Sequence, residues 1–204
     1  MGVLFATFYD RLMRSAERRS LGRLRHHLLS PLEGDILELG AGTGANLEHY
    51  GEGVRNLTLT EPSASMRSRL ERKARESEHA ERVRIHDARA ETLPFEDASF
   101  DAVTSTLVLC SVRDQAKALQ EIRRVLRPDG VLAVIEHVRH DGASRFLQHS
   151  LDPVWRLCAD GCRLIRQTGQ AIEDAGFRFE QRTSPALEPG TPFLRELLVG
   201  RAVR

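Results

Sequence analysis

Residues 35–44 read Asp-Ile-Leu-Glu-Leu-Gly-Ala-Gly-Thr-Gly, and they carry the strongest indication of the fold. Ile36, Leu37 and Leu39 form an apolar run of strand length, which is followed by glycine at every second position up to Gly44. Glycine lets the backbone turn tightly beside a ligand. The stretch therefore predicts a strand that runs into the glycine-rich turn of a nucleotide-cofactor site.

The residues around the turn favour one class of nucleotide cofactor. Similar turns serve dehydrogenases and flavin enzymes, so the glycines alone leave the cofactor open. Glu38, however, lies at the strand end just before the glycines, where its carboxylate can accept hydrogen bonds from a ligand ammonium. No Lys-Ser/Thr pair completes a phosphate cradle. These features favour S-adenosylmethionine over NAD or ATP.

Composition predicts one globular domain over residues 1–204, because 41% hydrophobic and 29% charged residues are ordinary for such a domain. The net charge of +1 gives no field that would recruit nucleic acid. The cysteines number three, there is no signal peptide, and no apolar run approaches the roughly 18 residues of a membrane span. We therefore expect a protein of the reducing cytoplasm.

Short apolar strands alternate with helical stretches after the glycine turn, which predicts a parallel sheet covered on both faces. The expected strands are residues 57–60, 83–86, 100–107 and 131–135, with closing strands at 177–182 and 194–203. The expected helices begin near Ala45, at caps Ser63 and Asp114, and near Gln170. A turn is expected at 128–130.

Two segments stand apart from this alternation. Residues 1–30 carry apolar residues three and four apart with many arginines between them, which predicts an amphipathic helical lead-in. We expect it to pack on the domain as a lid, and contact with a membrane surface is the less favoured alternative. Residues 138–168 hold few strand formers and form the expected insert that recognises a methyl acceptor.

Glu61 follows the second expected strand, 21 residues past Gly40. At this separation one strand-helix-strand unit delivers a carboxylate to the ribose hydroxyls of a bound nucleoside. The alternative is an acidic residue that stabilises the start of the next helix.

With the glycine turn, Glu61, Leu93-Pro94-Phe95 and Pro128-Asp129-Gly130, the chain resembles class I S-adenosylmethionine-dependent methyltransferases over nearly its whole length. The resemblance implies an α/β fold with a seven-stranded Rossmann-like sheet of order 3-2-1-4-5-7-6, whose last strand is antiparallel. It also implies a cofactor that lies across the carboxyl ends of the first four strands and leaves as S-adenosylhomocysteine.

The resemblance also assigns cofactor-binding residues. The methionine part is held by the positions that match Glu38, Gly40, Ala41, Gly42 and Gly44. The ribose is held at Glu61, the adenosine is flanked by Pro62 and Met66, the methionine side is lined by Thr106 and Leu107, and the set includes Tyr9 of the lead-in.

One departure concerns the adenine. Relatives often read Asp-Ala-Glu before Leu-Pro-Phe, and the Asp bonds the adenine amino group, whereas this chain has Arg89, Ala90 and Glu91. Because Arg89 has no acceptor atom, either Asp87 or the backbone at Ala90 is left to bind the base.

A subgroup is indicated by residues 106–112, 136–138, 151–155 and 160–166, which look like the methyltransferase-like group that includes thiol S-methyltransferases. Animal members carry a hydrophobic leader that we do not find here, so we expect a soluble, bacterial relative.

The resemblance favours a small thiol as methyl acceptor. O-, N- or C-methylation of a phenol, quinone precursor or phospholipid amine is the alternative. Two alternatives from other functional classes also remain: a module that binds the cofactor without turnover, and a dehydrogenase-like nucleotide-binding protein.

Each candidate residue on the methyl-acceptor side could instead have a purely structural role. His137, at a strand end, is the candidate general base or a structural histidine. His149, Trp155 and Arg166 of the insert are candidate contacts to the methyl acceptor, although Trp155 also suits the core and Arg166 a solvated helix face. No metal is expected, because Cys158 and Cys162 have no second ligand pair nearby and Cys110 lies in an apolar run. We expect a monomer or homodimer.

Overall fold

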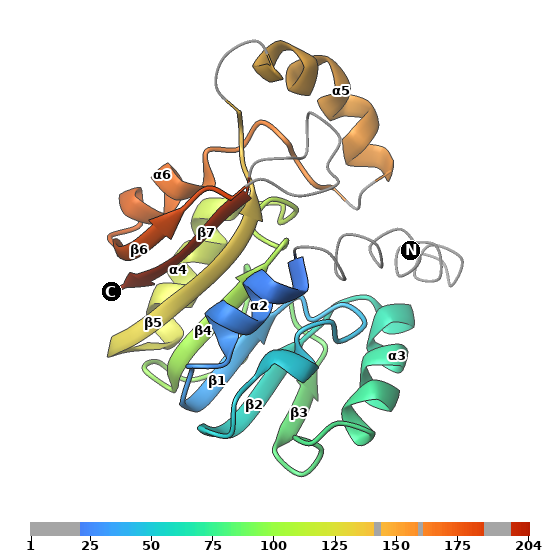
Figure 1. Cartoon of the computed structure of the whole chain (residues 1–204), viewed down its shortest axis with the longest axis vertical. Coiled ribbons are helices and arrows are strands. Elements are labelled where there is room, and N and C mark those ends of the chain that lie inside the picture. Colours follow the sequence, from blue (N-terminus) through green and yellow to red (C-terminus); the bar gives the residue numbers. More distant parts are fainter. Residues whose placement is uncertain (1–20, 141–143, 159–160, 186–196) are drawn as a thin grey trace.

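β1 (Gly34–Leu39), the strand predicted ahead of the glycine turn, lies in the interior of a seven-stranded sheet (Figure 1). The structure is a computed structural model that describes residues 21–140, 144–158, 161–185 and 197–204. The other strands are β2 (Val54–Thr60), β3 (Val83–His86), β4 (Phe100–Thr106), β5 (Leu126–His137), β6 (Arg178–Thr183) and β7 (Leu197–Val203). Their order is β3-β2-β1-β4-β5-β7-β6, as predicted. β7 is antiparallel to both neighbours, and the other pairs are parallel.

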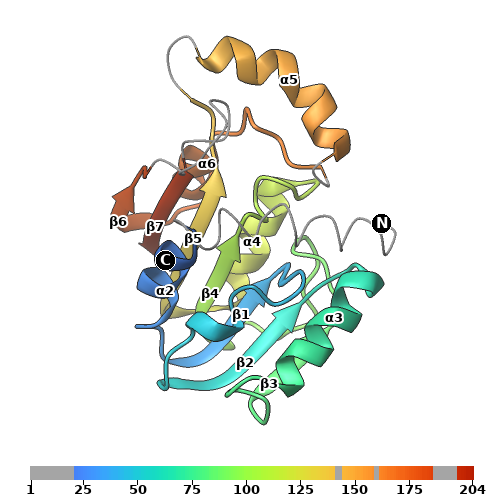
Figure 2. The same ribbon diagram turned by 45° about the vertical axis from the view of Figure 1, so that its right-hand side comes forward.

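Helices cover the two faces of this sheet. The elements are α2 (Gly22–Leu29), the 3-10 turn η2 (Leu47–His49), α3 (Ala64–Arg75), α4 (Gln115–Val125), α5 (Ser144–Cys158) and α6 (Thr168–Asp174). α2, η2 and α3 pack into one hydrophobic cluster, while α4 and α6 pack into another. Figures 1 and 2 show α5 beyond the carboxyl end of β5, away from both faces.

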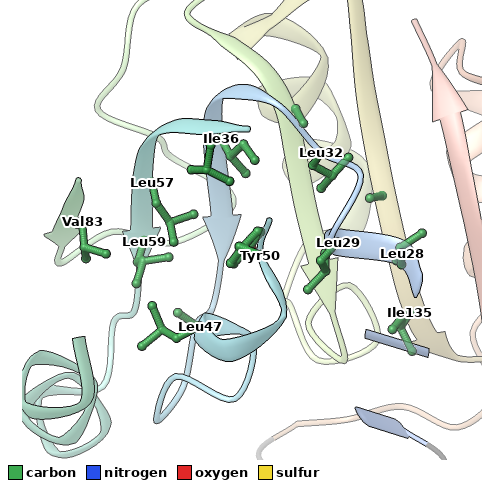
Figure 3. Packing of buried hydrophobic residues seen from close by; sticks show 14 of the residues in the cluster. Leu28, Leu29, Leu32, Ile36, Leu47, Tyr50, Leu57, Leu59, Val83 and Ile135 are labelled. Atoms are coloured by element: carbon green, nitrogen blue, oxygen red, sulfur yellow. The ribbon is translucent and has the colours of Figure 1, made fainter. Parts of the chain in front are cut away.

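β1 supplies side chains to both clusters, because successive residues of a strand point to opposite faces. Ile36 packs with Leu57 and Leu59 in the cluster that Figure 3 shows, whereas Leu37 and Leu39 belong to the cluster under α4. All five side chains are fully buried. A strand buried on both faces reads as a continuous apolar run, which explains why this stretch was the clearest signal in the sequence.

Two local predictions were wrong. The helix expected near Ala45 is replaced by turns and η2. The side chain of Asn46 donates hydrogen bonds to Glu38 of β1 and Thr106 of β4, and Gly51 ends the segment after a few residues. The turn expected at 128–130 lies inside β5 instead. Phe100 pairs with Leu126 and Ala102 with Val131, so β5 carries extra residues that bulge from the ladder without ending the strand.

The structure describes only part of the two segments that stand apart from the alternation, residues 1–30 and the insert 138–168. The first twenty residues, and with them most of the proposed lid and Tyr9, lie outside the described residues; α2 is the described end of that segment. The insert contains the long helix α5, for which no element had been predicted. Within the described ranges, no helix has both the length and the apolar character needed to cross a membrane.

The two predicted helix caps differ. Ser63 is the N-cap residue of α3, but its hydroxyl meets Ser65 Oγ at 3.1 Å and caps no backbone N–H. Asp114 caps α4 as predicted, because its carboxylate accepts a hydrogen bond of 3.0 Å from the Lys117 backbone N–H. That bond satisfies one of the N–H groups that have no partner within the helix.

Asp114→Ala tests this cap. We expect the free energy of unfolding to fall by about 1 kcal/mol, because the Lys117 N–H loses its bond. Urea unfolding monitored by circular dichroism gives the value. Asp129→Ala, which removes an exposed acid outside any helix, is the matched control and should change little. Equal losses in the two variants would show that charge and not capping is responsible.

Candidate active site

The glycine turn follows β1 at the carboxyl edge of the sheet. Gly40, Gly42 and Gly44 have φ of 53°, 58° and 86°, a region that side chains disfavour. A Cβ at Gly40 would lie 2.9 Å from Val108 Cγ2, and one at Gly44 would lie 2.8 Å from Leu47 Cδ1. At Gly42 the nearest atom would be the Gly40 carbonyl oxygen at 4.0 Å. Gly42 is therefore the glycine where a ligand can approach the backbone.

Glu61 holds this turn in place from the end of β2. Its buried carboxylate accepts 2.9 Å from the Gly42 N–H and 2.8 Å from the Ser63 N–H. The first bond ties Glu61 to the glycine turn, and binding of ribose hydroxyls by Glu61 stays a prediction. The second lies at the start of α3, as the alternative role requires, so one carboxylate serves both elements.

Glu38 lies at the centre of a buried polar network. In the sheet it is level with Leu59 of β2 and Thr104 of β4. Its carboxylate accepts 2.8 Å from the Tyr50 hydroxyl and 2.9 Å from Asn46 Nδ2. Tyr50 also meets Thr104 Oγ1 at 2.9 Å. Both oxygens of Glu38 thus have a partner before any ligand is present.

Arg25 of α2 extends the network and was missed from the sequence. Its buried guanidinium donates 2.6 Å to Asn46 Oδ1 and 2.9 Å to Thr106 Oγ1. A signal was present: Arg25 lies four residues after Leu21 and three before Leu28, on the apolar face of the helix. An arginine on that face predicts a buried partner, whereas Arg25 was counted only among the arginines between the apolar positions of residues 1–30.

Burial dominates the electrostatics of Glu38. Loss of solvation raises the pKa of Glu38 from 4.5 to about 7, against the opposing effects of the Tyr50 hydrogen bond and the Arg25 charge. Burial likewise raises the pKa of Tyr50 well above its ordinary value. A carboxyl group poised near neutrality can lose its proton when a cation binds beside it.

The residues predicted around the adenosine gather at the ends of β2 and β3. Met66 is buried, whereas Pro62 and Arg89 are exposed. Ala90 is buried in the loop beyond β3. Asp87, the possible substitute for the missing Asp, pairs with Arg67 at 3.0 Å, so its carboxylate is already engaged.

Glu136 fixes the loop after β4 and was not predicted as a site residue. Its buried carboxylate accepts 2.6 Å from Ser105 Oγ and 2.9 to 3.1 Å from the backbone N–H groups of three successive loop residues, Val108 to Cys110. Burial raises the pKa of Glu136, although these bonds oppose the rise. Leu107, just before this loop, has φ of 63°, which is rare for a non-glycine residue.

Two of the residues predicted on the methyl-acceptor side, His137 and Trp155, meet at Cys162. His137 is half-buried, with Nδ1 at 3.7 Å from Cys162 Sγ. Trp155 packs against Cys110 and Cys162, so it belongs partly to the core. His149 lies on the exposed side of α5.

Arg166 has an unexpected role for a predicted substrate contact. Its guanidinium donates to the carbonyl oxygens of Leu109 and Val112. This bonding braces the loop that follows β4. A contact between Arg166 and a methyl acceptor stays a prediction.

Comparison with known proteins identifies the family. A family model for a methyltransferase domain matches residues 37–134. Thiol S-methyltransferase TMT1A from Homo sapiens is 36% identical over 178 residues, which cover 86% of this chain and 72% of that protein. The chain belongs to the class I S-adenosylmethionine-dependent methyltransferases.

Other relatives of this methyltransferase are more distant. A demethylmenaquinone methyltransferase from Clavibacter sepedonicus is 34% identical over 135 residues, which cover 66% of this chain and 51% of that protein. The solved structure of an S-adenosylmethionine-dependent methyltransferase from Thermotoga maritima superposes with a TM-score of 0.73 at 20% identity, over 98% of this chain and 96% of that one. That similarity shows a shared fold.

The observed site fits S-adenosylmethionine, the cofactor of this methyltransferase. The space beside Gly42 would be filled by a Cβ, as expected where a ligand meets the backbone. Glu38 offers a carboxyl group suited to the ammonium, and Glu61 offers one suited to hydroxyl groups. When bound, the cofactor supplies a methyl group activated by a sulfonium.

Glu38→Gln tests the buried carboxyl group through stability. The folded methyltransferase keeps the Glu38 proton up to a pKa of about 7, whereas the unfolded chain loses it near 4.5, so the wild-type free energy of unfolding falls as the pH rises between these values. This contribution, up to roughly 3 kcal/mol, is absent from the variant. Urea unfolding at about pH 5 and about pH 8 should therefore show a smaller pH difference in Glu38→Gln than in wild type.

Glu121→Gln is the matched control for this experiment. A hydrogen bond from Arg124 holds the pKa of Glu121 below its ordinary value, so this group is ionised in both the folded and unfolded states over the same pH range. The control should keep the wild-type pH difference. The same difference in Glu38→Gln would show that Glu38 is ionised throughout.

Proposed function

We propose that this enzyme transfers the methyl group of S-adenosylmethionine to the sulfur of a small thiol. The observation that carries the proposal is the 36% identity to a thiol S-methyltransferase over 86% of the chain. The chemistry of the described residues is consistent with it. The Glu136 carboxylate is occupied by Ser105 and by three backbone donors, which leaves His137 as the base candidate at the end of β5.

The roles of the cofactor-binding residues belong to the same proposal. Glu38 receives the ammonium, Glu61 the ribose hydroxyls, and Gly42 provides the close approach of the backbone. Thr106 and Leu107 line the methionine side, Pro62 and Met66 flank the adenosine, and the backbone at Ala90 binds the base. These residues hold the reacting groups in line and exclude water, which is the main task of a methyltransferase site.

A thiol makes the smallest demand on these residues. With an ordinary pKa near 8.5, roughly a few per cent of a thiol is already thiolate at neutral pH, so no strong base is needed. A phenol or an ammonium must be deprotonated at greater cost. Methylation at oxygen, nitrogen or carbon remains the alternative, favoured by the similarity to a demethylmenaquinone methyltransferase.

Gly42→Val tests the cofactor site. We expect the affinity for S-adenosylhomocysteine, measured by titration calorimetry, to fall at least about a hundredfold, because the side chain fills the space beside the backbone. Gly176→Val is the matched control, since Gly176 also has a positive φ, of 86°, but follows α6 far along the chain. The control variant has the same kind of backbone strain and should bind S-adenosylhomocysteine with wild-type affinity. Wild-type affinity in Gly42→Val would show that the turn does not contact the cofactor.

A matched set of methyl acceptors tests the thiol. We would incubate the enzyme and S-adenosylmethionine with 2-phenylethanethiol, 4-ethylphenol or 2-phenylethylamine and measure released S-adenosylhomocysteine, with Gly42→Val as the background. The thiol should react at least roughly tenfold faster than the others, because it ionises most readily near neutral pH. Turnover of the phenol or amine with an inert thiol would reject S-methylation and leave the methyltransferase assignment intact.

A further inference from the structure

A cluster of two cysteines and a histidine lies at the carboxyl ends of β4 and β5. Cys162 Sγ is 3.5 Å from Cys110 Sγ and 3.7 Å from His137 Nδ1. The three ligand atoms all lie within 4.8 Å of one another. Cys110 and Cys162 are buried and His137 is half-buried, so the cluster is enclosed but reachable through the histidine.

Hydrogen bonds of the backbone hold these three residues close together, in addition to the orientations of their side chains. The Arg163 N–H donates 2.9 Å to the carbonyl oxygen of Cys110, which docks the segment of Cys162 on the loop after β4. The Cys110 N–H donates 3.0 Å to Glu136, the neighbour of His137. Arg166 binds two carbonyl oxygens of the same loop. The cluster is therefore preorganised by bonds that do not involve the two sulfur atoms or the imidazole nitrogen atoms.

We propose that Cys110, His137 and Cys162 form a binding site for a soft divalent cation, with zinc as the expected ion. With Zn–S near 2.3 Å and Zn–N near 2.05 Å, a tetrahedral ion separates two sulfurs by about 3.8 Å and a sulfur from a nitrogen by about 3.6 Å. The observed separations of 3.5 and 3.7 Å lie close to both values. Two sulfurs and one imidazole nitrogen are also ligands that zinc prefers.

Charge balance supports a cation at this position. Two thiolates and a neutral imidazole neutralise one divalent ion, so the loaded cluster is uncharged and can be buried without a large solvation penalty. Without the ion, the same two thiolates would place two negative charges 3.5 Å apart and close to the buried Glu136. Binding therefore releases two protons, one from each thiol, to the solvent.

The histidine distinguishes this site from a cysteine pair prepared for oxidation. A disulfide would join the two sulfurs without involving His137 Nδ1, whereas a metal ion would bind all three groups. Three protein ligands leave a fourth position for water or an added ligand, as in zinc sites that are not purely structural. Spacing along the chain does not indicate such a site, because Cys162 lies 52 residues from Cys110 and 25 from His137.

Metal titration of the reduced protein, residues 1–204, tests the proposal. After chelator treatment, the protein should take up one equivalent of Zn²⁺ in competition with a chromophoric chelator, and Co²⁺ in its place should show thiolate-to-cobalt charge-transfer absorption. Cys162→Ser and His137→Ala should each weaken Zn²⁺ binding by at least roughly a hundredfold. His149→Ala, which removes an exposed histidine of α5, is the matched control and should retain wild-type affinity.

Several results would overturn the site. These are no Zn²⁺ uptake by the reduced wild-type protein, a cobalt spectrum without charge transfer, or the same affinity in Cys162→Ser, His137→Ala and His149→Ala. A Cys110–Cys162 disulfide that forms in air, in a protein that binds no metal when reduced, would replace the metal site by a redox pair. None of these readouts involves methyl transfer, so the outcome is independent of the proposed methyl acceptor.

Discussion

Buried carboxylates that bind neighbouring loops are the interaction on which the site depends. Glu38, Glu61 and Glu136 lie at the carboxyl ends of β1, β2 and β5. Glu38 and Glu61 accept hydrogen bonds from the segment after β1, whereas Glu136 accepts them from the loop after β4. A buried carboxylate without donors would be strongly destabilising, so the loops must close on these groups when the chain folds. The parallel sheet thus shapes the site before a ligand arrives, since it brings all three strand ends to one edge.

The sequence revealed those parts of the fold and site whose signals are local. The apolar run of β1, the alternating glycines and Glu61 lie within one short unit of two neighbouring parallel strands and their connection, where spacing along the chain translates into spacing in three dimensions. The strand order followed from a resemblance to a family and not from periodicity. The turn predicted from Pro128 and Asp129 was wrong, because a turn signal in the sequence cannot distinguish a bulge inside a strand from the end of a strand.

Residues whose partners lie far along the chain could not be predicted in the same way. Arg25 is 81 residues from Thr106, and Tyr50 is 54 from Thr104. Each contact exists only because β4 inserts beside β1 in the sheet, which no local pattern records. Cys110 and Cys162 illustrate the same limit, since the apolar run that holds Cys110 and the insert that holds Cys162 become neighbours only when the insert folds back.

The position of Arg25 also makes the amino-terminal helix part of the site. The guanidinium is buried and donates to Asn46 and Thr106, while Asn46 in turn donates to Glu38. If α2 separated from the sheet, Asn46 and Thr106 would each lose a charge-assisted bond, and Glu38 would lose the nearby charge that favours its ionised form. Docking of α2 and ionisation of Glu38 are therefore thermodynamically linked. Any ligand cation that favours the Glu38 carboxylate must, by that linkage, also strengthen the attachment of α2.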